Sequence, residues 1–456
     1  MYKFFEYTFF GFLILLATSW PFGYFIQNLS IGLPVLELSI FCLSVLSLAR
    51  VDIYLIYRRN LILPFLWLVI GLIFYLTIGY YKHGIYALRD GAFFTSAVIF
   101  FPAFIFAYSS RKLNFVILFK ILFYSSLWLE VLDRTLLANL FGDLTFLTFG
   151  QAEAPIFGGT MGSGVVIFGT LLLALTSLKV KISLLDLVFL FLAMELLILH
   201  QTRTYYLSLF VIIISLNILD SKFLKSTFLF SVCFLLLFTV NSYVFELLRS
   251  VWGLAFETYV ETSRVLKFSD VDPSINMMTS LLSQGLTDYS PENSITQNLN
   301  KETLEFSGSA GGLHQRLAWW NYLVSRGLMD VHSAIFGLGY GADLNFWVNR
   351  VREPHNVLVS VFARGGLLIL ILWLFFLCWM ACNIWIYYKS KLSTNDEIML
   401  ITSIGVQLST LATSLFQPSF TSTPVCISFY LFSGIIFGFI FRDKRQALIA
   451  SSNHLY

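Results

Sequence analysis

The stretch VLVSVFARGGLLILILWLFFLCWMACNIWIYY, residues 357–388, decides the class of fold. It is mostly apolar and aromatic, and Arg364 is its one charged residue. A helix from His355 to Lys389 would be roughly 50 Å long at 1.5 Å per residue, whereas the hydrocarbon core of a bilayer is about 30 Å thick. The stretch therefore predicts a membrane-spanning helix whose first turns, up to Arg364 and the Gly-Gly pair that follows it, project outward or bend into a cavity.

Apolar runs of this kind recur along the whole chain. Hydrophobic residues make up 57% of the 456 residues and charged residues 12%, against roughly 25% charged in an average globular chain. So few charges cannot cover a water-facing surface, which excludes a soluble enzyme, a disordered chain and a nucleic-acid binder. We expect an all-α integral membrane protein with about 12 transmembrane helices. The runs that predict them are residues 4–20, 34–49, 61–78, 92–108, 114–132, 164–178, 183–199, 204–219, 224–245, 357–388, 398–415 and 424–441.

The distribution of Lys and Arg predicts the orientation of these helices. Cytoplasmic loops of membrane proteins carry an excess of Lys and Arg. With the N-terminus inside, every inside connection is basic, as at residues 442–445, whereas the short outside connections hold few basic residues. Both termini are then cytoplasmic. The chain divides into helices 1–9 over residues 1–245, a large periplasmic loop over 246–354, and helices 10–12 with a cytoplasmic C-terminus over 355–456.

The second half of the loop predicts a helix of its own. In GLHQRLAWWNYLVSRG, the residues Arg316, Trp320, Leu323 and Gly327 follow one another at steps of four, three and four. These steps place them on one helical face. We expect an amphipathic helix over 314–326 that ends at Gly327.

Two arginines are the first candidates for binding an anionic substrate. Arg203 opens the eighth apolar run at the predicted outer boundary of the membrane, and Arg316 lies on the amphipathic helix. A guanidinium offers a planar bidentate fork to phosphate oxygens. The alternative is that both arginines are interfacial or solvated charges, since long basic side chains also reach phospholipid phosphates from a helix end. Glu195, near the outer end of the seventh run, is a candidate ion-pair partner for Arg203.

His355 is the candidate for a general base. It follows Pro354, and proline is favoured at the start of a helix, so we expect His355 in the first helical turn beside Asn356. The positive end of a helix favours neutral imidazole over imidazolium, and the neutral form is the one that a base requires. The alternative is a capping or interface histidine.

The remaining polar features predict no metal and no cofactor. The five cysteines fall inside apolar runs, and the histidines show no metal-ligand spacing. In FGLGYG, the glycines Gly337, Gly339 and Gly341 form either a plain turn or a turn whose backbone N–H groups bind an anion.

The region from Arg316 onward resembles the O-antigen ligase/polymerase superfamily of polytopic membrane glycosyltransferases. The features that match are, in order along the chain, Arg316, Trp319-Trp320, IFGLGYG, His355-Asn356 and, after nine further residues, Gly366. The Thr-Arg pair at 202–203 is also similar to an earlier arginine of the family. About a dozen spans and one large outer loop near the C-terminus extend the resemblance to the architecture of the whole chain.

The resemblance implies a metal-independent glycosyltransferase at the periplasmic face of the bacterial inner membrane, with an undecaprenyl-diphosphate-linked oligosaccharide as donor. Arg203 and Arg316 would neutralise the departing diphosphate, and His355 would deprotonate the acceptor hydroxyl. The accessory candidates are Asn356, Trp320, Glu195 and Gly339. The implied partners are a glycan acceptor, membrane lipids and, as a further candidate, a chain-length regulator, but no nucleic acid.

The acceptor distinguishes the members of this superfamily. A polymerase transfers the glycan onto the next lipid-linked repeat unit, a ligase onto lipid A–core, and a protein O-oligosaccharyltransferase onto Ser or Thr. Ile369 stands where the ligases often place Gly, Thr or Tyr, which favours the polymerase. A lipid-linked glycan flippase or transporter is the alternative from another class. Such proteins carry ionisable residues in the middle of the membrane, whereas the charges of this chain cluster at the predicted outer edge.

Overall fold

The computed structural model describes most of the helical framework and the second half of the long loop. The described residues are 4, 6–11, 42–43, 46, 63–84, 87, 96–110, 114–132, 146–149, 152–155, 163–200, 203–219, 311–342, 344, 356–389, 392–415 and 423–453. Most of the predicted span 34–49, all of 224–245, the loop segment 246–310 and His355 lie outside them.

Where the structure describes the predicted apolar runs, helices occupy them. The long helices are α4 (Leu63–His83), α7 (Phe100–Ser109), α8 (Phe115–Leu132), α10 (Ser163–Val180), α11 (Leu184–His200), α12 (Arg203–Leu219), α16 (Gly311–Gly327), α18 (Val357–Tyr388), α19 (Thr394–Ser414) and α20 (Thr423–Asn453). Within the described residues, three stretches are long and apolar enough to cross a membrane: Leu66–His83, Val357–Tyr388 and Val425–Arg442. The helical class is confirmed for this part of the chain, whereas the number of twelve crossings stays a prediction.

A short β-hairpin lies in the connection between α8 and α10. Its strands, β1 (Phe146–Phe149) and β2 (Ala152–Pro155), pair antiparallel with Phe146 opposite Pro155. This hairpin was not expected in an all-α fold, but two four-residue strands do not change the helical fold class. Four-residue strands give little periodic signal, which is why the sequence did not predict them.

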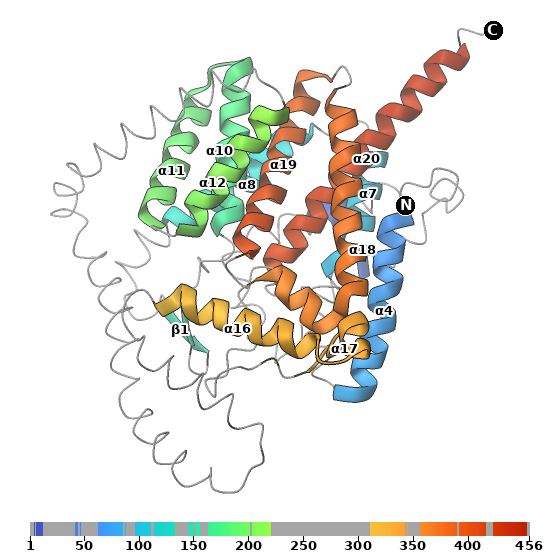
Figure 1. Ribbon diagram of the computed structural model, residues 1–456. Helices are drawn as coiled ribbons and strands as arrows, with labels where there is room; N and C mark the ends of the chain where they lie inside the picture. Colours follow the sequence, from blue (N-terminus) through green and yellow to red (C-terminus); the bar gives the residue numbers. More distant parts are fainter. Residues whose placement is uncertain are drawn as a thin grey trace, which may run out of the picture.

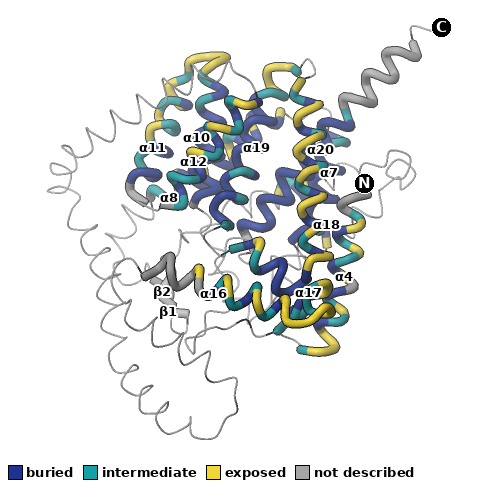
Figure 2. Tube along the Cα trace, viewed as in Figure 1, coloured by how far each residue is buried: buried dark blue, intermediate teal, exposed yellow. Residues whose placement is uncertain are grey.

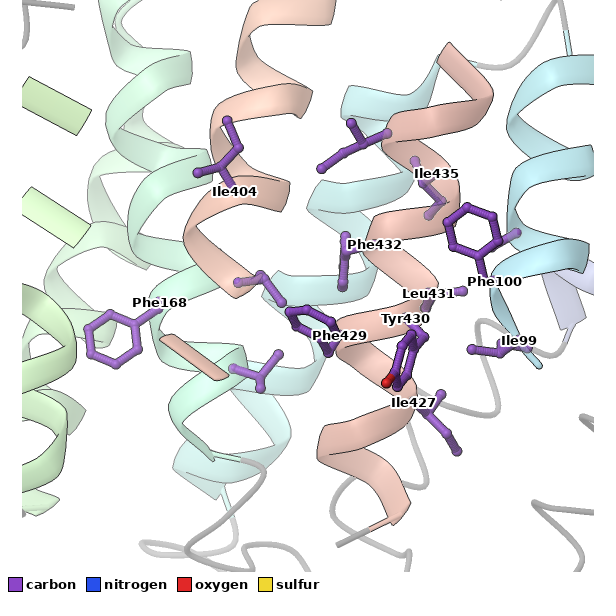
Figure 3. Packing of buried hydrophobic residues seen from close by; sticks show 14 of the residues in the cluster. Ile99, Phe100, Phe168, Ile404, Ile427, Phe429, Tyr430, Leu431, Phe432 and Ile435 are labelled. Carbon is purple, nitrogen blue, oxygen red and sulfur yellow. The ribbon is translucent and has the colours of Figure 1, made fainter. Parts of the chain in front are cut away.

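The core lies around α20. Figure 3 shows Phe432 of α20 in one cluster with Phe100 of α7 and Ile404 of α19. The Phe432 ring also lies 5.3 Å from the Phe119 ring of α8. At Gly438, α20 approaches α7 so closely that a Cβ would lie 2.6 Å from the Phe104 carbonyl oxygen. Small residues allow two helix backbones to come this close.

The long helix α18 is broken at Gly366. This residue has φ 65° and ψ −169°, a conformation that essentially only glycine adopts. Residues 357–365, before the break, pack against α16, and the part after the break runs along the bundle (Figure 1). In the same view α16 runs below the lower ends of α10, α11 and α12. The helix thus changes direction at the Gly-Gly pair, whereas the prediction that its first turns project outward or enter a cavity stays a prediction.

Candidate functional site

The amphipathic helix α16 packs on the first turns of α18. Trp319 and Leu323 are buried in one apolar cluster with Ala363 of α18. The Trp319 indole N–H donates to the Leu344 carbonyl oxygen at 3.1 Å. The helix extends over Gly311–Gly327, so the prediction of a helix over 314–326 that ends at Gly327 is confirmed. Residues far apart in the sequence are thereby brought to one place, at the end of α18 that follows His355.

Arg316 and Trp320 lie next to this packed stripe. Arg316 comes one helical turn before Trp319 and Trp320 on α16, and its side chain lies outside the described part of the chain. Trp320 is half-buried, and its indole nitrogen is buried without a hydrogen-bond partner among the described residues. A buried donor of this kind costs about 1–3 kcal/mol if it stays unsatisfied. An acceptor oxygen of a bound ligand would satisfy it, so Trp320 stays an accessory candidate.

The FGLGYG turn holds the break in α18. It follows the short helix α17 (Val331–Phe336), and its Leu338 and Gly339 N–H groups donate to the carbonyl oxygens of Ala363 and Arg364 at 2.8 and 3.0 Å. A broken helix leaves such carbonyls without helical partners. The Gly339 N–H is therefore used within the fold. The alternative in which it binds an anion is not the one the structure adopts.

Two glycines make this contact possible. Gly337 and Gly366 both have a positive φ, and they lie back to back. A Cβ on Gly337 would lie 2.6 Å from the Gly366 nitrogen, and a Cβ on Gly366 would collide with the Ile335 carbonyl oxygen. Any larger side chain at either position must push the turn away from α18.

Asn356 caps α18. Its backbone is extended, and its side-chain oxygen accepts the N–H groups of Leu358 and Val359 at 2.9 and 3.2 Å. The helix begins at Val357, so the prediction that the first turn contains His355 is wrong. Asparagine is favoured at the N-cap of a helix, because its side-chain oxygen satisfies N–H groups that have no helical partner. His355 directly precedes the cap, next to the positive end of the helix.

Two further residues belong to this region, although the sequence analysis did not select them as site residues. Arg364 is only 4% exposed at the break of α18. Its charge inside an apolar run was the signal that could have found it, since such charges are costly and usually functional. His83, the last residue of α4, lies against the turn: a Cβ on Gly341 would be 2.6 Å from the His83 Cβ. The His83 Nε2 is buried without a hydrogen-bond partner in the described part of the chain.

Arg203 and Glu195 lie on α12 and α11, two helices that follow one another in the chain and pack mainly on α19 and α10, respectively, rather than on α16 or α18. Arg203 is the first residue of α12, and Glu195 is half-buried in α11. The Arg203 side chain lies outside the described part, so the ion pair between them stays a prediction.

Comparisons with known proteins add no family. Neither a scan against family models nor a search of curated proteins finds a match for this chain. Within the described residues, no group of three or more His, Cys, Asp or Glu side chains could hold a metal ion.

Proposed function

We propose that the chain is a membrane glycosyltransferase that transfers a polyprenyl-diphosphate-linked glycan to an acceptor sugar, as a surface-polysaccharide polymerase. One observation carries the proposal: α16, with Arg316, packs directly on the turns of α18 that follow His355. A candidate anion ligand thus lies on a helix in contact with α18, and the candidate base directly precedes the cap of α18 in the chain. The site would lie at the outer face of the bacterial inner membrane.

The chemistry requires few groups. The acceptor hydroxyl oxygen attacks the anomeric carbon of the donor, and the bond from that carbon to the diphosphate oxygen breaks. The diphosphate leaves with the electron pair, and its growing charge is neutralised by Arg203 and Arg316. The hydroxyl proton passes to His355. The positive end of α18, which directly follows His355 in the chain, favours a neutral imidazole before the reaction.

Ile369 is the residue that bears on the identity of the acceptor. Within the resemblance to the superfamily, Ile369 favours a polymerase over a ligase. This residue is fully buried in α18. Its Cδ1 lies 3.2 Å from where a Cβ on Gly71 of α4 would be. Packing between α4 and α18 therefore also accounts for isoleucine here. Analysis of the polysaccharide product distinguishes the two acceptors.

Deletion of the gene tests the proposal. For a polymerase, the surface polysaccharide should run on a gel as single-repeat caps on lipid A–core, with lipid-linked units on the outer leaflet. Unmodified core with long lipid-linked chains would instead indicate the ligase. Lipid-linked units trapped on the inner leaflet would contradict both and indicate a flippase. Complementation by His355→Ala should fail although the protein reaches the membrane.

Metal dependence gives an independent test. A diphosphate is already a good leaving group, and the arginines supply the positive charge. Transfer by the purified protein is therefore expected to survive EDTA. Loss of activity that added Mg²⁺ or Mn²⁺ restores would contradict the proposed mechanism.

A further inference from the structure

The turn between α16 and α17 carries a run of exposed apolar side chains. Leu328, Met329 and Val331 are 55%, 77% and 75% exposed. Ile335 and Phe336 of α17 are 41% and 37% exposed. We call residues 328–336 the elbow. Exposed apolar side chains gathered in one short segment, here around the exposed Asp330 and His332, mark a site of contact with another apolar phase or partner.

The elbow is attached to the ends of two candidate membrane spans. α17 packs on α18 at the break, and the Phe336 ring lies 6.5 Å from the Tyr75 ring of α4. Figure 2 shows exposed surface on α17, on the lower end of α4 and on α18 together at one side of the molecule. On α18 this surface begins directly after the break, with Leu367 and Leu368 both 41% exposed. The elbow thus continues the apolar outer surface of α4 and α18.

The length of α18 indicates how deep the elbow would lie in a bilayer that this helix spans. From Gly366 to Tyr388 the helix rises about 33 Å at 1.5 Å per residue, close to the roughly 30 Å of a hydrocarbon core. With the Lys389 end at one membrane surface, the break and the elbow therefore lie at the other surface. α4 ends at the same level with the exposed residues Tyr80, Tyr81 and Lys82. Tyrosines and a basic residue at a span end are typical of a membrane–water interface.

We propose that the elbow inserts into the boundary between headgroups and acyl chains of the bilayer and contacts lipid directly. Its apolar side chains are continuous with the outer surfaces of two spans, and they lie at interfacial depth. The elbow would hold α16 in the plane of the membrane surface, as interfacial amphipathic helices lie. This inference requires only that α4 and α18 span a membrane. It holds whether or not the chain transfers a glycan.

The depth of Met329 can be measured in the full chain. Met329→Cys, in a background where Cys42, Cys233, Cys378 and Cys382 are replaced, is labelled with an environment-sensitive fluorophore and reconstituted in phosphatidylcholine nanodiscs. Cys426 can stay because it is buried. Two reference positions are labelled in the same way. Phe375, which is 56% exposed on the outer surface of α18, is replaced by Cys as the reference for a lipid environment. Asn395, which is exposed at the start of α19, is replaced by Cys as the reference for water.

We expect the fluorophore at position 329 to be quenched by lipid, as at position 375, but from a shallower depth in the bilayer. Phosphatidylcholine brominated near the headgroup end of its acyl chains should quench it, deeper bromines should quench it less, and aqueous iodide should have little effect. Strong quenching by iodide alone, as at Asn395, would overturn the proposal. Protection from both quenchers would also overturn it, because another part of the chain or a second copy would then cover the elbow. Val331→Cys gives the same measurement if the Met329 variant does not elute as a folded, monodisperse protein.

Discussion

The two longest described helices, α18 and α20, have opposite surroundings. In α20, 94% of the candidate span is buried inside the protein, whereas in α18 the share is 28%. Yet α18 is the more apolar of the two, with a mean hydropathy of 2.5 against 1.9. Hydropathy therefore indicates that both can cross a membrane, but it does not indicate which one lies at the centre of the bundle.

The glycines of the two helices account for the difference. Gly434 and Gly438 of α20 are helical and let its backbone approach α7. Gly366 of α18 leaves the helical conformation and admits the turn after α17. In α20 glycine serves close packing, and in α18 it serves a change of direction that positions the turns beside α16. Substitutions should separate these two roles.

The largest effect is expected from Gly438→Leu. The new side chain would need space now occupied by the Phe104 carbonyl oxygen and the Ala107 Cβ, each 2.6 Å from the Cβ position. Overpacking of a core costs typically 1–3 kcal/mol and more where backbone must move. The measurement is the yield of monodisperse protein and its melting temperature in detergent. Gly11→Leu is the control, since a Cβ on Gly11 would meet nothing within 4 Å. Equal yields for the two variants would show that close packing of α20 on α7 is not needed.

Gly366→Ala should instead leave the bundle folded and impair catalysis. The conformation of Gly366 costs alanine about 1–3 kcal/mol, and the added Cβ would collide with the Ile335 carbonyl oxygen. The turns before the break should then shift, and a shift of about 1 Å in a catalytic group can cost about 10²-fold in rate. Transfer rate and melting temperature are measured together. A wild-type rate would mean that the break does not position the site.

A smaller effect is expected where α20 meets α19 through a hydrogen bond. The Gln407 side-chain N–H donates to the Ser433 hydroxyl at 2.8 Å, and both residues are buried. Hydrogen bonds between membrane helices contribute about 0.6 kcal/mol on average. Ser433→Ala should lower the melting temperature slightly. A double-mutant cycle with Gln407→Met should give a coupling of this size, and a coupling of zero would show that apolar packing alone holds α20.

The smallest effect concerns the cap of α17 and depends on pH. Hydrogen bonds from the Ser333 backbone N–H and hydroxyl hold the pKa of Asp330 below its usual range. A lowered pKa in the folded state means that the cap stabilises α17 fully above the ordinary carboxyl pKa. This stabilisation is lost as the pH falls through the lowered value. Amide exchange in α17, corrected for intrinsic rates, should therefore rise at acid pH. In Asp330→Asn the pH dependence should disappear, and a retained dependence would point to another group.

The sequence predicted helix positions well and site details less well. Apolar runs determine where α18 and α20 lie, because the spacing of apolar residues is a local property. The bend at Gly366 was also predictable, since the run is longer than a bilayer is thick. The predicted run 357–388 coincides with α18, but Asn356 caps the helix, so His355 was wrongly expected in its first turn. The pairing of Gly339 with Arg364 could not be predicted, because it joins two distant segments through backbone atoms that carry no sequence signal.

The central claim is that the end of α18 beside α16 is a glycosyl-transfer site with His355 as its base. The most direct measurement compares purified wild type and His355→Ala in proteoliposomes that contain a polyprenyl-diphosphate-linked repeat unit. Both the rate of product formation and the binding of the donor lipid are measured. A general base contributes roughly 10² to 10⁴-fold in rate, so His355→Ala should lose that factor and bind the donor nearly as well as wild type. A folded His355→Ala protein that elongates the glycan at the wild-type rate would contradict the claim.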